Sequence, residues 1–105
     1  MIEVIIGFDC CPDQTTWYVT ESKKDLLVAS SSSYYSDLAH NTTTQKLCLN
    51  EGKYVFSIHD STGNGLCCLE RFGYYYVISY SSVIAIGGFF EFSESMSFEI
   101  PFVLL

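Results

Sequence analysis

The chain has 105 residues, of which 49% are hydrophobic and 16% aromatic, and its formal net charge is −7. This length suits one domain with one core, residues 1–105, and so apolar a composition excludes an intrinsically disordered chain. Only five Lys and Arg residues are present, and Lys23-Lys24 is the longest basic run. Because phosphates are neutralised by a basic face, nucleic acids and anionic membrane surfaces are excluded as partners.

Short segments rich in β-branched and aromatic residues alternate along the chain with polar turns. In chain order, the predicted strands are residues 2–8, 15–21, 26–29, 42–49, 53–59, 73–80, 83–86 and 96–100. The fifth is the clearest, because Tyr54, Phe56 and Ile58 share one face of a strictly alternating segment. About eight short strands without a helical period predict an all-β fold, an antiparallel β-sandwich or jelly roll.

A weak internal repeat divides the domain into two halves, about residues 15–49 and 73–101. The segment 17–20 resembles 75–78, and the segment 27–30 resembles 83–86. Each half reads as an aromatic strand, a turn, a Val/Ile-Ala strand, a Ser-containing loop and a closing strand. We therefore expect two related β-halves that face each other, since a solenoid needs several copies.

Cysteine is abundant for so short a chain, with residues Cys10, Cys11, Cys48, Cys67 and Cys68. The absence of a C-x-x-C pair and the presence of only two His residues argue against a zinc site. A disulfide framework in an oxidising, extracellular compartment is predicted instead. Neighbouring cysteines pair poorly with each other, so bridges between the two vicinal pairs, with Cys48 as a further partner, are expected. The odd count leaves one thiol free or bonded to another chain.

The most specific motif is Asp60-Ser61-Thr62-Gly63-Asn64-Gly65-Leu66-Cys67-Cys68, which follows the alternating strand. It resembles a family of secreted, Cys-rich β-modules of marine bacteria and of algae such as diatoms, where this stretch reads Asp-Ser-Tyr-Gly-Asp-Gly-Ile-Cys-Cys. Further matches are Cys48-Leu49, Gly73-Tyr74-Tyr75, Gly87-Gly88 and Pro12-x-x-Thr15-Thr16-Trp17. The resemblance covers nearly the whole chain and implies a module of secreted or cell-surface proteins without known catalytic machinery. Lys53 stands where that family often has a Cys, which leaves the disulfide pairing open.

The same loop has two interpretations. Asp60, Thr62 and Asn64 have the i, i+2, i+4 spacing of the first half of a calcium loop, and Asp9 lies in a loop that is expected nearby. The bidentate Glu of a complete calcium loop is missing, since Arg71 occupies its place. In the alternative interpretation, the side chains bond local backbone amides in an Asx-type turn. Calcium is the only cofactor that the sequence suggests.

No enzyme activity is expected. Nucleophilic catalysis needs a nucleophile, a base and an orienting group, and His40 and His59 are the only histidines. His40 lies in a Ser/Asn/Thr segment, and His59 ends a strand. The motifs G-x-S-x-G and H-E-x-x-H and a phosphate-binding loop do not occur.

Asn41-Thr42-Thr43 is an N-glycosylation acceptor sequence in a predicted loop. Asn41 is therefore the candidate glycosylation site, and the protein is predicted to be a glycoprotein. Chance matches are common in so Thr-rich a region.

Both ends of the chain are apolar. Ile2, Val4 and Ile6 share one face of the first strand, and Phe102, Val103, Leu104 and Leu105 end the chain. The C-terminal apolar run, residues 100–105, is far too short to span a bilayer. A terminal apolar strand can complete a neighbouring sheet, and repeated head-to-tail contacts build a filament. In the alternative, both ends pair within their own domain.

Two functions follow as hypotheses. The first is a non-catalytic, extracellular structural module, a subunit of a cell-surface or secreted fibril of identical copies joined through strand or tail contacts. The second is a calcium- or carbohydrate-binding adhesion module of a secreted protein. Exposed aromatic residues would bind the glycan, with Tyr34, Tyr35 and Trp17 as candidates.

Overall fold

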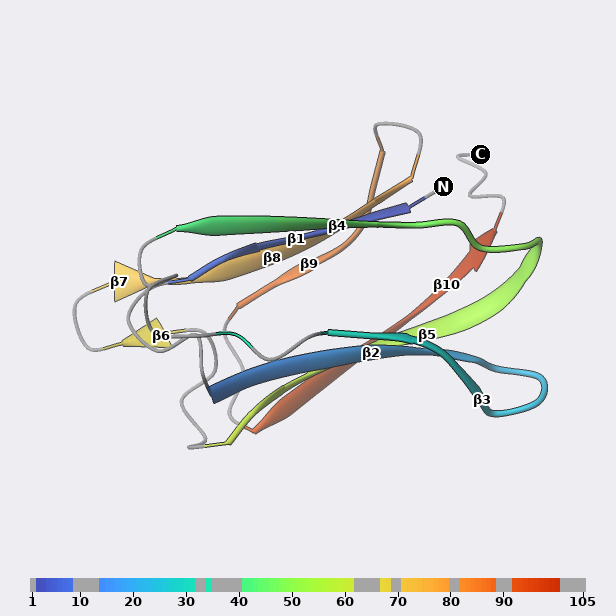
Figure 1. Ribbon diagram of the computed structural model, residues 1–105, viewed down its shortest axis with the longest axis horizontal. Helices are drawn as coiled ribbons and strands as arrows, with labels where there is room; N and C mark the ends of the chain where they lie inside the picture. The colour runs from blue at the N-terminus through green and yellow to red at the C-terminus, as the bar shows by residue number, and fades with distance from the viewer. Residues whose placement is uncertain are drawn as a thin grey trace.

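The computed structural model describes residues 2–8, 14–31, 34, 41–61, 67–68, 71–79, 82–88 and 92–100, with the backbone alone at 67–68 and 71–72. Every regular element longer than one turn in this part of the chain is a β-strand (Figure 1). The strands are β1 (Ile2–Gly7), β2 (Thr15–Glu21), β3 (Leu26–Ser30), β4 (Thr42–Leu47), β5 (Gly52–Asp60), β6 (Cys67–Cys68), β7 (Arg71–Phe72), β8 (Tyr74–Ser79), β9 (Ser82–Gly87) and β10 (Ser93–Ile100).

Eight of these strands form two four-stranded antiparallel sheets that lie face to face (Figure 1). Sheet A has the order β4-β1-β8-β9, and sheet B has the order β10-β5-β2-β3. The short strands β6 and β7 pair only with each other. The predicted all-β, antiparallel fold is confirmed at this level. The β6–β7 hairpin was not predicted, because two-residue strands carry no periodic signal.

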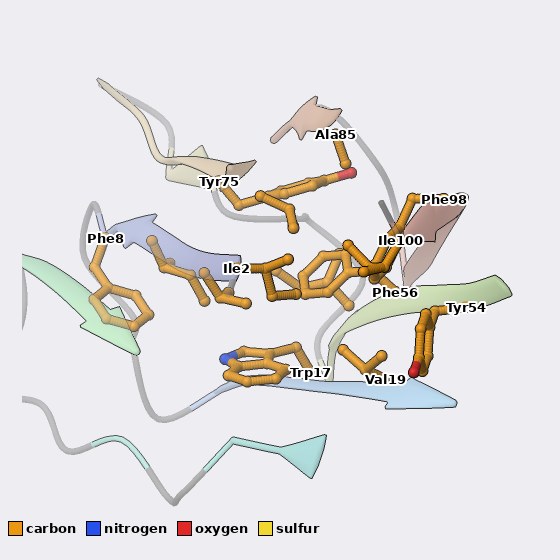
Figure 2. Close-up of a cluster of buried hydrophobic side chains, with 14 residues drawn as sticks. Ile2, Phe8, Trp17, Val19, Tyr54, Phe56, Tyr75, Ala85, Phe98 and Ile100 are labelled. Atoms are coloured by element: carbon orange, nitrogen blue, oxygen red, sulfur yellow. The ribbon is translucent and has the colours of Figure 1, made fainter. Parts of the chain in front are cut away.

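The core fills the space between the two sheets, and strand alternation supplies it (Figure 2). Trp17 on β2, Phe56 on β5 and Tyr75 on β8 are its largest fully buried side chains. The ring centroids of Trp17 and Phe56 lie 5.9 Å apart, and those of Phe56 and Tyr75 lie 5.3 Å apart. Each such side chain contributes roughly 1.5–3 kcal/mol by leaving water. The three rings therefore hold sheet A against sheet B.

A polar contact also joins the sheets. The Tyr75 hydroxyl donates a hydrogen bond to the carboxylate of Glu94 on β10. Burial, and then the Glu94 hydrogen bond and charge, raise the pKa of Tyr75 above its usual range. β10 begins at Ser93, three residues before the predicted strand. The sequence did not predict this first part, because its inward residue, Glu94, is polar.

The topology has an internal two-fold correspondence. Exchanging β1 with β5, β2 with β8, β3 with β9 and β4 with β10 turns the order of sheet A into that of sheet B. The β2–β3 ladder shifts register between Val19 and Thr20, and the β8–β9 ladder shifts between Val77 and Ile78. These bulges occupy equivalent positions, because Ala29 pairs with Val19 as Ala85 pairs with Val77. The segments that correspond include those that the sequence repeat aligned.

The stacking of the sheets decides which edge strands lie together. β9 of sheet A contacts β10 of sheet B, so these two edges form one lateral side of the molecule. β3 and β4 therefore form the opposite side, as Figure 1 shows. The two-fold correspondence exchanges these sides, since it maps β3 onto β9 and β4 onto β10.

Candidate assembly edges

The N-terminal strand is not available as an edge. Ile2, Val4 and Ile6 are almost completely buried in the core. β1 pairs with β4 on one side and with β8 on the other, so its backbone groups are used within the domain. At the N-terminal end, the structure therefore has the alternative arrangement, in which the strand pairs within its own domain. The predicted tail contact of Phe102, Val103, Leu104 and Leu105 lies outside the described residues.

One exposed apolar edge is β3, which ends sheet B. Leu26, Leu27 and Val28 are 56%, 57% and 40% exposed. The strand carries no charged residue, and no described strand pairs with its outer side. Native edges are usually protected by charges, prolines or bulges, and β3 has only the bulge. An edge of this kind is a template for a further strand.

The equivalent edge is β9, which ends sheet A. Val83 and Ile86 are 49% and 57% exposed, and β9 also carries no charge. Val83 corresponds to Leu27 of β3, since each follows the hairpin turn and pairs one residue before the bulge. The same apolar edge therefore occurs twice, on opposite sides of the molecule.

The other two edges carry charged side chains. Exposed Lys46 lies on β4, and Glu94 and exposed Glu99 lie on β10. Charged residues on an edge strand disfavour addition of a further strand, because the strand contact would desolvate them. The four sheet edges thus divide into an apolar pair, β3 and β9, and a charged pair, β4 and β10.

A groove accompanies the β3 edge on the outer face of sheet B. It has a volume of about 510 Å³ and is lined by Tyr18, Thr20, Leu27 and neighbouring residues. Its walls combine aromatic rings, methyl groups and hydroxyls with the Asp25 carboxylate at the hairpin end, and its apolar part suits an aliphatic side chain of an added strand.

The structure describes only one residue of the predicted calcium set. Asp60 is 2% exposed at the end of β5, where its N–H donates to the Phe92 carbonyl at 2.8 Å. Next to it, Ser61 donates to the carbonyl of Gln14 at 3.0 Å. Thr62, Asn64 and Asp9 lie outside the described residues. Among the residues that are described, no three His, Cys, Asp or Glu side chains gather as a metal would require.

Of the five cysteines, Cys48 alone has a described side chain. It is exposed just after β4, and its thiol is free. Cys67 and Cys68 are placed by their backbone in β6, and Cys10 and Cys11 are outside the described part. The disulfide pairs stay a prediction.

Asn41 is exposed immediately before β4, and its carbonyl accepts a hydrogen bond from the N–H of Phe8 at 2.9 Å. Its side chain is accessible, as a glycosylation site requires. Glycosylation itself stays a prediction.

The aromatic residues proposed for glycan binding occupy a different place. Trp17 is 1% exposed, and its indole N–H donates to the Tyr34 hydroxyl at 2.8 Å. Tyr35 is outside the described residues. The outer face of sheet A instead presents Tyr74 and Tyr76, whose ring centroids lie 5.2 Å apart. Alternation within β8 separates these outward rings from the inward Tyr75, and the sequence alone could not tell which face was inward.

Comparisons with known proteins found no counterpart for this chain. No protein-family model matches the sequence, and no curated protein and no solved structure is significantly similar. In the described residues, no helix is long and apolar enough to cross a membrane.

Proposed function

We propose that this protein is a non-catalytic, extracellular structural module whose copies assemble through strand contacts into a fibril. The observation that carries the proposal is the pair of exposed, uncharged apolar edges, β3 and β9. Strand addition there would give the backbone N–H and C=O groups partners and would remove Leu27 and Val83 from water. Two separate edges per molecule are the minimum that a chain of identical copies requires.

The proposal extends to the class of fold and to the compartment. Each half has the strand order fourth, first, second, third, distributed over both sheets, which is the order of a Greek key. We therefore assign the fold to the β-sandwiches of two Greek keys, the class that includes jelly rolls. The cysteine content and the resemblance to secreted modules support an extracellular or cell-surface location.

The first test measures assembly directly. Sedimentation velocity and negative-stain electron microscopy of the purified chain should reveal oligomers that grow with concentration. A single charge in the β3 edge, Leu27→Asp, should remove them, whereas Thr44→Asp on the charged β4 edge should not. Circular dichroism of each variant checks that the fold is kept. A wild-type protein that stays monomeric to millimolar concentration would refute the proposal.

The binding alternative is supported by the exposed tyrosines of sheet A. The Tyr74 ring lies across Gly7, where any side chain would collide with it, and its hydroxyl lies 3.5 Å from the Thr42 hydroxyl. An aromatic ring beside hydroxyl groups offers both an apolar face and hydrogen bonds to a sugar. Titration calorimetry with a glycan panel, and with calcium for the Asp60 loop, tests this alternative. Heat that Tyr74→Ala abolishes would favour a glycan site.

A further inference from the structure

We propose that the contact between copies is head-to-tail, with β3 of one molecule adding to β9 of the next. The inference rests on the proposed assembly function and specifies its geometry. The two edges lie on opposite lateral sides, so such a contact leaves one free β3 and one free β9 at the ends of every chain. A heterologous contact that does not close on itself grows into an open filament.

The charges beside the two edges favour this pairing over a contact between like edges. The β3 side carries exposed Lys23 and Lys24 in its hairpin turn, and Lys46 on β4. The carboxylates there are Asp25 in the turn and Glu21 at its base, which accepts a hydrogen bond from the Lys23 N–H. The β9 side carries exposed Glu99 on β10, and the partly buried Glu94, which accepts the Tyr75 hydrogen bond, adds to the negative charge of this side. Three of the five basic residues of an acidic chain therefore lie on one side and face carboxylates on the other. A β3-to-β9 contact brings opposite charges together, whereas like edges bring equal charges together.

Some charges on the inner strands have the reverse sign. Glu21 lies on β2, next to β3, whereas Glu3 and Lys53 lie on β1 and β5, next to β4 and β10. Glu3 on β1 pairs in register with Lys46, and Lys53 on β5 pairs with Glu99. These residues lie one strand spacing, about 4.8 Å, further from the neighbouring copy than the edge strands do, so their opposing effect is weaker. The outermost charges therefore set the polarity of the contact.

The shapes of the two edges agree with the charges. The groove beside β3 is lined by Tyr18, Thr20 and Leu27, and Ile86 projects from β9 with 57% of its surface exposed. Because β3 and β9 have their bulges at equivalent positions, both edges have the same local change of twist. Two edge strands that bend at the same position can pair with each other on both sides of the bulge.

Two edge-blocking variants distinguish the geometries. Leu27→Asp blocks β3, and Val83→Asp blocks β9 at the equivalent position. Aspartate has a low strand propensity, and burying its charge in a strand contact costs free energy. We expect each variant alone to be monomeric by sedimentation velocity. An equimolar mixture should give discrete heterodimers, since one free β9 meets one free β3. Thr44→Asp serves as the matched control and should polymerise as the wild type does.

The outcomes separate this inference from the function on which it rests. If the wild type polymerises but Val83→Asp alone still dimerises through β3, the head-to-tail contact is wrong and assembly stands. The head-to-tail contact is also wrong if the mixture of the two variants stays monomeric while the wild type polymerises. If the wild type never assembles, both proposals fall.

Charge reversal tests the steering. In low salt the double variant Lys23→Glu, Lys24→Glu should elongate at least about tenfold more slowly than the wild type. The difference should shrink in high salt, where screening removes it. Equal elongation rates in low salt would show that charge does not set the polarity.

Discussion

The hydrogen bond between Trp17 and Tyr34 gives a sharp test of the packing. The indole N–H belongs to a side chain that is 1% exposed, and the Tyr34 hydroxyl accepts its hydrogen bond at 2.8 Å. Tyr34 also packs edge-on against Phe8, with ring centroids 4.9 Å apart. The variant Tyr34→Phe keeps this ring contact and removes only the acceptor. It therefore isolates the cost of leaving a buried donor without a partner.

The expected cost follows from that geometry. A buried donor that loses its partner costs about 1–3 kcal/mol. For 105 residues the unfolding entropy is about 0.22 kcal/mol/K, so the melting temperature should fall by about 5–14 °C. Trp17 is the only tryptophan, so its fluorescence reports urea unfolding directly. The midpoint should fall while the slope m stays constant, because the surface exposed on unfolding hardly changes.

The matched control is Tyr76→Phe, which removes a hydroxyl from a half-exposed ring on the outer face of sheet A. Its free energy of unfolding should change by less than about 0.5 kcal/mol. If Tyr34→Phe changes stability as little as this control does, the indole finds another acceptor and the reasoning fails.

Three further predictions concern single residues. The exposed thiol of Cys48 should be alkylated by iodoacetamide in the native protein, as mass spectrometry would show, and protection until unfolding would contradict its exposure. Because the pKa of Tyr75 is raised in the folded state, the unfolded chain releases this proton first. The contribution of Tyr75 to stability should be constant below about pH 10 and fall above it. Tyr75→Phe should flatten that fall in urea titrations, and an unchanged pH dependence would exclude the buried Tyr75 hydroxyl as its cause. Gly88→Ala should cost more than about 1 kcal/mol, because Gly88 has φ +157° and a Cβ there would lie 2.5 Å from the Gly73 carbonyl oxygen. A Gly88→Ala protein that unfolds at the wild-type urea midpoint would contradict this close approach.

Strand prediction succeeded where one face was purely apolar. In β5 the residues Tyr54, Phe56 and Ile58 occupy one face of the alternating strand, and the structure buries all three. In β10 the inward residue Glu94 is polar, so its first part carried no hydrophobic alternation and was missed. Its partner, the Tyr75 hydroxyl, comes from the other sheet. Such a pairing depends on a contact across 19 residues of sequence and has no local signal.

The aromatic residues show the same limit. Tyr74, Tyr75 and Tyr76 are adjacent and chemically equal, and only their register against β1 decides that Tyr75 is buried and the others face outward. The sequence predicted Trp17 as a candidate surface ring for glycan binding. In the structure it lies in the core, where its ring packs against Phe56. A one-residue change of register would reverse both assignments.

The sequence by itself determined that the chain is all-β, because alternation and turn residues are local properties of the chain. The assembly hypothesis came from the apolar residues at both ends of the chain. Only the tertiary structure decided which strands are edges. β1 is apolar yet central, whereas β3 and β9 are apolar and exposed. Strand order arises from contacts between distant segments, so no pattern along a single strand shows whether its second side is paired.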